Sequence, residues 1–183
     1  MRVKRPCQTA IRTGAFLAAC WTGILAAHAQ QAPTLPGGAT SLNERHGDWT
    51  VACIVQDNNK RCSLSQQQVD AQSRQRMLAI ELGAVTEGKA EGALVLPFGL
   101  ALEKGVVLRV DEGEPLPALA FRTCLPAGCV VPVSFDTGTI AVLRKGKKLQ
   151  LEAVADGGNP ISFSISLAGL AGAFDRLAEL GKS

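Results

Sequence analysis

Residues 47–65 read GDWTVACIVQDNNKRCSLS, and this stretch decides the fold class. Four of its residues alternate with polar or small ones, which is the period of a half-buried strand: Trp49, Val51, Cys53 and Val55. A turn-forming cluster follows at 57–60, and a strand pattern resumes at Cys62. If the two strands pair as a hairpin, Cys53 and Cys62 face each other across it. We therefore expect the folded domain to begin near Gly47.

The pattern continues outward as a series of short strands separated by glycine- and proline-containing turns. The expected strands cover 76–82, 92–96, 106–110, 118–124, 130–135, 140–144, 149–154 and 161–167. Many short strands with such turns predict an all-β sandwich or barrel. The final segment differs, because its apolar residues recur at helical spacing: Leu167, Leu170, Phe174, Leu177 and Leu180. A short C-terminal amphipathic helix should cap one end of the sandwich, with Asp175, Arg176 and Glu179 on its polar side.

The amino-terminal residues predict export. A basic head precedes an uncharged run at 13–27, and Ala27-His28-Ala29 has the small-x-small form of a cleavage site. We expect residues 1–29 to be a signal peptide, 30–46 a flexible leader and 47–183 the β-sandwich domain, with no transmembrane helix in the mature chain. An alternative is a lipobox ending at Cys20, which would be lipidated.

Charge excludes one class of function. The full chain has a net charge of +3, with 19 basic and 16 acidic residues. Signal cleavage removes four basic groups and no acidic one, so fifteen basic residues face sixteen acidic ones. A strongly basic nucleic-acid-binding protein is thereby excluded.

Four cysteines stay in the mature chain: Cys53, Cys62, Cys124 and Cys129. An even number in an exported protein indicates disulfides, and the close spacing favours Cys53–Cys62 and Cys124–Cys129. A zinc site built from all four thiolates is a poor alternative, because C-x8-C and C-x4-C are not the short spacings of zinc knuckles.

No catalytic constellation is visible. The mature chain has one histidine, His46, expected to be solvated in the leader, and a nucleophilic triad needs an imidazole held on rigid structure. The acidic run at 111–114 contains Gly113 and precedes Pro115, so it indicates a turn, with weak calcium binding as the alternative. Phosphate-binding glycine loops are absent. We expect neither a cofactor nor an enzymatic activity.

Two exposed stretches are candidate binding sites. The basic run Arg144, Lys145, Lys147 and Lys148 is expected either to form a hairpin turn that protects strand edges or to contact a polyanion. The segment Cys124–Cys129 forms a four-residue loop closed by a disulfide. Such a loop either staples two strands or, being ordered in advance, belongs to a partner-binding face with Leu125 at its tip and Pro126 beside it. The polar segment 66–76, which begins with three glutamines, has no periodic pattern and predicts an exposed connection with a strand edge.

Four sets of landmarks have a recognisable order: GDW at 47–49, LPFGL at 96–100, FRTCLPAGC at 121–129 and SLAGL at 166–170. This order and spacing resembles the invasion-associated locus B family of exported bacterial proteins, over about residues 47–180. The resemblance implies an immunoglobulin-like β-sandwich, a location in the periplasm or at the outer membrane of a Gram-negative bacterium, and an association with host-cell entry. It supplies no catalytic residues.

The function expected from these observations is that of a non-catalytic exported envelope protein that binds an envelope or host partner, or an anionic surface component. Peripheral association with a membrane is compatible with this expectation. The alternative is a periplasmic module that binds a small ligand in a pocket between the sheets or under the helix.

Overall fold

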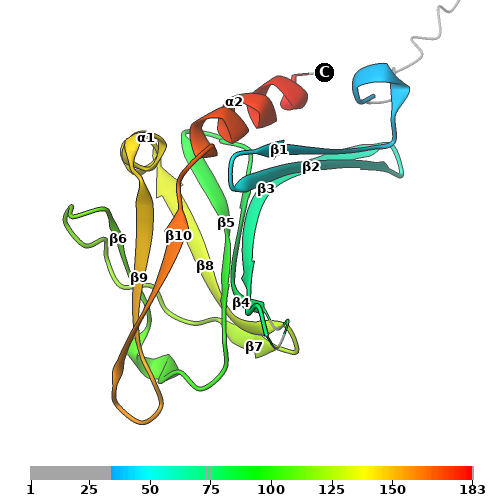
Figure 1. Ribbon diagram of the computed structural model, residues 1–183. Coiled ribbons are helices and arrows are strands. Elements are labelled where there is room, and N and C mark those ends of the chain that lie inside the picture. Colours follow the sequence, from blue (N-terminus) through cyan, green and yellow to red (C-terminus); the bar gives the residue numbers. More distant parts are fainter. Residues whose placement is uncertain (1–33, 73, 75, 183) are drawn as a thin grey trace, which may run out of the picture. The chain divides into compact units, whose positions relative to one another are not determined.

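The computed structural model describes residues 34–72, 74 and 76–182, which form two antiparallel β-sheets and two α-helices (Figure 1). The predicted signal peptide, its cleavage site and Cys20 lie outside the described residues. Short 3-10 helices occur at Pro36–Gly38 and Leu102–Lys104. No helix in the described part of the chain is long and apolar enough to cross a membrane.

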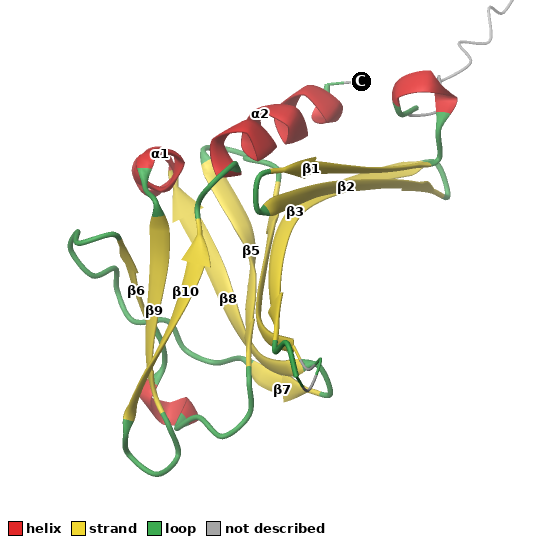
Figure 2. Ribbon diagram, in the orientation of Figure 1, coloured by secondary structure: helices red, strands yellow, loops and turns green. Residues whose placement is uncertain are grey.

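The larger sheet has seven strands in the order β1-β2-β3-β4-β5-β8-β7. Their bounds are β1 Ser41–His46, β2 Trp49–Gln56, β3 Asn59–Val69, β4 Arg76–Gly83, β5 Lys89–Leu96, β7 Thr123–Leu125 and β8 Gly128–Asp136. The smaller sheet has the order β10-β9-β6, with β6 Val107–Val110, β9 Lys148–Val154 and β10 Pro160–Ser166. Figure 2 shows the two layers in yellow.

The core lies between the two sheets. It consists of the alternate residues of each strand that face inward. Leu94 of β5, Val131 of β8 and Leu151 of β9 are fully buried. The predicted class, an all-β sandwich of immunoglobulin-like kind with a short C-terminal helix, is confirmed.

The hairpin that opens the domain has the predicted geometry. Trp49 and Val51 are fully buried and Cys53 is 5% exposed, so the three share one face. Asp57 and Asn58 both have positive φ, which suits a two-residue turn between right-handed strands. Cys53 and Cys62 are register partners and form a disulfide.

Helix α2, Leu170–Gly181, covers this hairpin (Figure 1). Its buried residues are the predicted stripe with one alanine added: Leu170, Ala173, Phe174, Leu177 and Leu180. Leu167 is also buried but precedes the helix. The stripe therefore packs on β1, β2 and β3 and closes this side of the core.

The expectation of a flexible leader up to His46 is wrong for its last six residues. Ser41–His46 forms β1, an edge strand paired with β2 from Ser41↔Ile54 to His46↔Trp49. Leu42, Glu44 and His46 are half-buried and alternate with exposed residues. The sequence shows no apolar periodicity here because two of the three covered positions carry polar side chains.

The strand expected at 140–144 is also wrong, because helix α1 occupies Thr137–Lys145. The side chain of Asp136 accepts a hydrogen bond from the backbone N–H of Thr139 at 2.7 Å and so caps the helix. Ile140 and Leu143 are buried at a spacing of three, which is one turn of helix. Alternating Ile140, Val142 and Arg144 mimicked a strand, but Val142 is 53% exposed.

The strand expected at 118–124 is reduced to its last part. Only Thr123–Leu125 belongs to a strand, while Leu119 makes an isolated bridge with Val106. Residues 111–122, which we call the strap, join β6 of the smaller sheet to β7 at the edge of the larger one.

Candidate functional site

The four landmark motifs of the sequence meet in pairs at two places in the fold. GDW at 47–49 contacts SLAGL at 166–170, and LPFGL at 96–100 contacts the Cys124–Cys129 hairpin. We call the first place the buried junction, which comprises Gly47, Asp48, Trp49, Gln66 and Ser166–Gly169. The second includes what we call the apolar end, made of Val69, Met77, Phe98 and Leu125.

Two glycines allow the buried junction to close. Gly169 has φ of 89°, and a Cβ there would lie 2.0 Å from the carbonyl oxygen of His46. Gly47 has φ of 59°, and its Cβ would lie 2.6 Å from the carbonyl oxygen of Ala168. The backbone N–H of Asp48 donates to that same Ala168 oxygen at 3.0 Å. The turn between β1 and β2 can therefore touch the start of α2 only because both contacting residues are glycines and neither segment has a side chain there.

Polar side chains complete the junction. The Nε1–H of Trp49 and the Nε2–H of Gln66 each donate to the carbonyl oxygen of Ser166 at 2.9 Å. The backbone N–H of Ser166 donates in turn to Oε1 of Gln66 at 3.2 Å. Two positions along β3, Gln68 donates to the carbonyl oxygen of Ser164.

Gln66 and Gln68 are not part of the exposed connection that the sequence predicted over 66–76, whereas residues 71, 72 and 74 do lie in an exposed turn after β3. Both glutamines lie in β3, and Gln66 is only 8% exposed. Their side-chain amides hydrogen-bond to the main chain of β10 and so join the two sheets along one side. A run of three glutamines gives no sign of burial in the sequence. Only the hydrogen bonds to β10 show that Gln66 and Gln68 join the two sheets.

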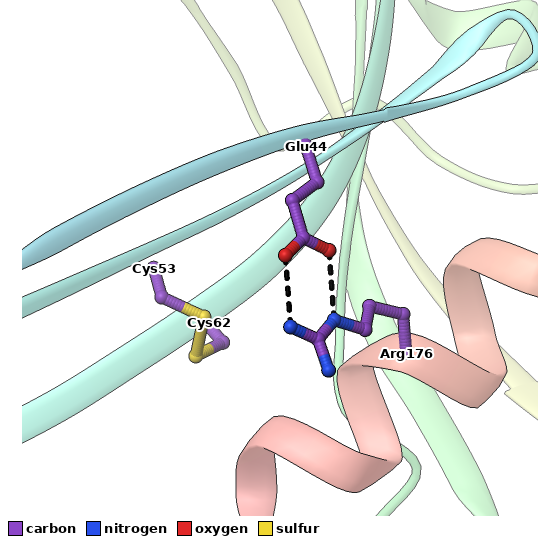
Figure 3. Close-up of a disulfide and its surroundings, with 4 residues drawn as sticks. All are labelled: Glu44, Cys53, Cys62 and Arg176. Atoms are coloured by element: carbon purple, nitrogen blue, oxygen red, sulfur yellow. Dashed lines mark hydrogen bonds and ion pairs between the residues drawn. A yellow bond between two sulfur atoms is a disulfide. The ribbon is translucent and has the colours of Figure 1, made fainter. Parts of the chain in front are cut away.

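A further polar cluster fixes α2 to β1 (Figure 3). Arg176 of α2 donates to both carboxylate oxygens of Glu44, at 2.7 and 2.8 Å. These hydrogen bonds hold the pKa of Glu44 below its ordinary value and raise that of Arg176. Nε2 of His46 lies 3.6 Å from a Glu44 oxygen, and the His46 side chain is 26% exposed. The expectation of a solvated leader histidine is therefore wrong.

The Cys124–Cys129 disulfide is present as expected, and its hairpin belongs to the edge of the larger sheet. Leu125 pairs with Gly128, so the turn consists of Pro126 and Ala127, and Leu125 lies in the strand beside it rather than at a loop tip. A Cβ on Gly128 would lie 2.5 Å from the carbonyl oxygen of Leu96. This contact holds the hairpin against the end of β5.

The apolar end is a group of large apolar side chains that do not enter the core. Leu125 is 51% exposed and Phe98 is 61% exposed. Val69 and Met77, at the end of β3 and the start of β4, are 53% and 42% exposed. Strands β3, β4, β5, β8 and β7 are neighbours and antiparallel, so all four side chains lie at the same end of the sheet. The ends of β5 and β7 are two strand spacings apart, roughly 10 Å.

Of these residues, the sequence singled out only Leu125. Phe98 lies in a motif that the sequence recognised, but a phenylalanine after a strand is equally compatible with the core. Val69 stands between polar residues, and Met77 lies in the expected strand 76–82, so neither was singled out as an exposed apolar residue. Their grouping follows from the strand order.

The basic run lies at the other end of the molecule. Arg144 and Lys145 end α1, and Lys148 begins β9, so the run joins a helix to a strand rather than two strands. Arg144 pairs with Asp175 at 2.6 Å, and Lys148 with Glu112 at 3.7 Å. The backbone N–H groups of Lys147 and Lys148 donate to the carboxylate of Asp111. Local acidic groups thus balance much of the charge that a polyanion would need.

The acidic run at 111–114 forms the expected turn, in which Asp111 has φ of 49°. No group of three or more potential metal ligands gathers among the described residues.

The two predicted binding stretches cannot form one site. Strand β8 begins at the Cys124–Cys129 hairpin, and its end at Asp136 caps α1, which carries Arg144 and Lys145. Nine residues of strand span about 27 Å. The apolar end and the basic run are therefore separate surfaces (Figure 1).

Comparisons with known proteins place these features in one family. The family model described as "Invasion associated locus B (IalB) protein" matches residues 49–178. An invasion protein B homolog of Brucella abortus (strain 2308) is 44% identical over 152 residues, which cover 82% of this chain and 87% of that protein. Invasion protein B of Bartonella bacilliformis is 41% identical over 152 residues, covering 81% of each chain.

A solved structure shares the fold. The crystal structure of invasion associated protein b from Bartonella henselae is similar with a TM-score of 0.72 and 35% sequence identity, covering 77% of this chain and 97% of that one. The sequence landmarks, the two-sheet fold and these relatives agree: the chain belongs to the invasion-associated locus B family.

Proposed function

We propose that this protein is a non-catalytic, exported envelope protein that binds a protein partner through its apolar end. The observation that carries the proposal is the exposure of Phe98 and Leu125, at 61% and 51%. Both belong to landmark motifs, yet neither side chain contributes to the core. Grouped exposed apolar side chains are typical of protein-interaction surfaces.

The surroundings of these residues suit recognition. The Cys124–Cys129 disulfide and the contact of Gly128 with Leu96 hold the hairpin in one conformation. A surface ordered before binding loses less conformational freedom on contact. Loops at the end of a rigid sandwich are also where binding residues concentrate.

Export and the lack of catalysis have their own support. Both disulfides require an oxidising compartment, in agreement with the secretory signal that the sequence predicts. The relatives are named invasion proteins, and the only histidine among the described residues, His46, is near a structural ion pair. We propose that the partner belongs to the bacterial envelope or to a host cell surface.

The test compares three forms of the exported, oxidised protein as baits: wild type, Leu125→Asp and Val142→Asp. Val142 is the matched control, because it is 53% exposed but lies on α1 at the opposite end of β8. Each bait is incubated with intact envelopes and with host-cell membranes, and the retained proteins are quantified by mass spectrometry.

We expect a specific set of proteins to be retained by the wild type and by Val142→Asp, and to be lost with Leu125→Asp. The melting temperatures of all three baits should agree, since each substitution is at an exposed position. A partner set unchanged by Leu125→Asp would contradict the proposal. So would binding of the wild type to protein-free lipid vesicles, lost with Leu125→Asp, since the surface would then recognise lipid.

A further inference from the structure

The two sheets are joined on one side and separated on the other. On the β10 side, Gln66 and Gln68 of β3 bond to the main chain of β10. On the β6 side, a cleft of about 310 Å³ separates β6 and the strap from β8 and the start of α1. This cleft is remote from the apolar end, because it adjoins Asp136 rather than Gly128.

The cleft has an apolar floor and a polar mouth. Its apolar lining comes from Leu108 of β6, Leu116 and Leu119 of the strap, and Phe135 of β8. Leu108 and Phe135 are buried, while Leu116 and Leu119 are half-buried and adjoin the core. Backbone hydrogen bonds from Leu116 to Leu108 and between Leu119 and Val106 fix the strap in place. The apolar floor is therefore built on rigid elements.

The mouth carries one cation and one carboxylate, Lys89 and Asp136, which are register partners across β5 and β8. The Asp136 carboxylate accepts the N–H of Thr139 and caps α1. Its pKa is below the ordinary value, chiefly because of that hydrogen bond and in part because of the charge of Lys89. Lys89 takes part in none of the ion pairs formed among the described residues. The ammonium group of Lys89, which makes no direct ion pair with Asp136, is therefore the group at the mouth that can hold an anion.

The neighbouring strand edge disfavours a peptide as the occupant. Beyond Val130, β8 has β5 on one side and no strand on the other within the described chain. The N–H of Arg122 donates to the carbonyl oxygen of Val130, so even-numbered residues of β8 direct their main-chain groups to this free side. One of them is Pro132, which has no N–H, so an added strand could not pair along the edge. Ser134, which lines the cleft, keeps a main-chain N–H and C=O on that side.

We propose that this cleft binds a small molecule with an apolar body and a single anionic group. The body would lie on Leu116, Leu119 and Phe135, above the fully buried Leu108, and the anion beside Lys89. The volume is at the lower end of the range for ligand pockets, about 300–1,000 Å³, so the occupant is a small one. This binding is independent of the partner surface at the apolar end.

Octanoate is a suitable probe, and 1-octanol is its matched control with the same chain and no charge. Methyl resonances of Leu108, Leu116 and Leu119 are followed by NMR while each compound is titrated into the wild-type protein. We expect saturable shifts at these methyl groups with both compounds and tighter binding of octanoate. Leu125→Asp should leave the titration unchanged.

Lys89→Met should weaken octanoate at least fivefold and change octanol binding by less than twofold, while Lys89→Arg should retain octanoate. Lys104→Met is the control, because Lys104 is an exposed lysine in the 3-10 helix 102–104, away from the cleft. The absence of saturable shifts would overturn the proposal. Shifts confined to Leu125, or equal effects of Lys89→Met on both compounds, would also overturn it.

Discussion

The buried junction and the apolar end are built from similar parts and have opposite accessibility. Each combines an aromatic residue with a glycine at positive φ, and each lies close to a disulfide: Trp49 and Gly169 at one, Phe98 and Gly99 at the other. Trp49 is fully buried, whereas Phe98 is 61% exposed. The junction residues are explained by packing, since every one of them closes the sandwich. The exposed aromatic and leucine at the apolar end have no such explanation, which is why we assign them to binding.

The largest test of this contrast replaces the aromatic residue of each region. Trp49→Ala should lower the free energy of unfolding by about 3–5 kcal/mol, because it leaves a large cavity in the core. It also removes the Trp49 donor to Ser166. Phe98→Ala should change the same quantity by less than about 0.5 kcal/mol. Urea unfolding followed by circular dichroism measures both. Equal losses would show that Phe98 is a core residue and would remove the contrast.

The next test compares two glycines with nearly the same backbone angle. Gly169 has φ of 89° and Gly99 has φ of 84°, but a Cβ at Gly99 meets nothing within 4 Å. Gly99→Ala should therefore lower stability by about 1 kcal/mol, which is the cost of placing an alanine in the left-handed backbone conformation. Gly169→Ala adds the clash with the His46 carbonyl and should cost about 2–3 kcal/mol or more. If thermal unfolding gives the same loss of stability for both variants, the close approach of the two segments at the junction is not required.

A third comparison concerns the disulfides. Replacing either pair by serine should destabilise by roughly 2–3 kcal/mol through loop entropy. The loss should be greater for Cys53→Ser with Cys62→Ser, because Cys53 is 5% exposed beneath α2, and a buried hydroxyl without a partner adds a further cost. Cys124 is exposed on the three-residue edge strand β7. Chemical denaturation of the two double variants gives the order, and a greater loss for the Cys124 and Cys129 pair would reverse our ranking.

The smallest expected effect lies at the ion pair beside the junction. Because the folded pKa of Glu44 is below its ordinary value of 4.5, its contribution to stability is present above about pH 4.5. That contribution is lost as the pH falls through the lowered folded pKa. The stability advantage of wild type over Glu44→Gln should therefore shrink between pH 6 and pH 3. Melting curves across this range measure it, and an advantage independent of pH would mean that the Glu44–Arg176 pair does not stabilise the fold.

Local patterns predicted the elements whose partners are close in the chain. The hairpin of β2 and β3, the pairing of Cys53 with Cys62 and the buried stripe of α2 follow from periodicity within a few residues. β1 and α1 were missed because short local patterns misled in both cases. In β1 two of the covered positions carry the polar residues Glu44 and His46, so no apolar alternation is visible. In α1 the spacing of Ile140 and Val142 imitates a strand, although Asp136 caps a helix there.

Sequence by itself determined the fold class, both disulfides, the C-terminal helix and the family of this protein, because periods of two and 3.6 residues and short cysteine loops are local properties. Only the tertiary structure decided which landmark residues are buried and which are exposed. Phe98 and Trp49 each lie in a recognisable motif, but α2 and β10 pack over the hairpin that carries Trp49, and no described element covers Phe98 as closely. The same holds for the cleft beside Lys89, whose walls come from three separate segments of the chain, at 89, 108–119 and 134–139. Burial depends on such non-local neighbours, and a one-dimensional pattern does not contain them.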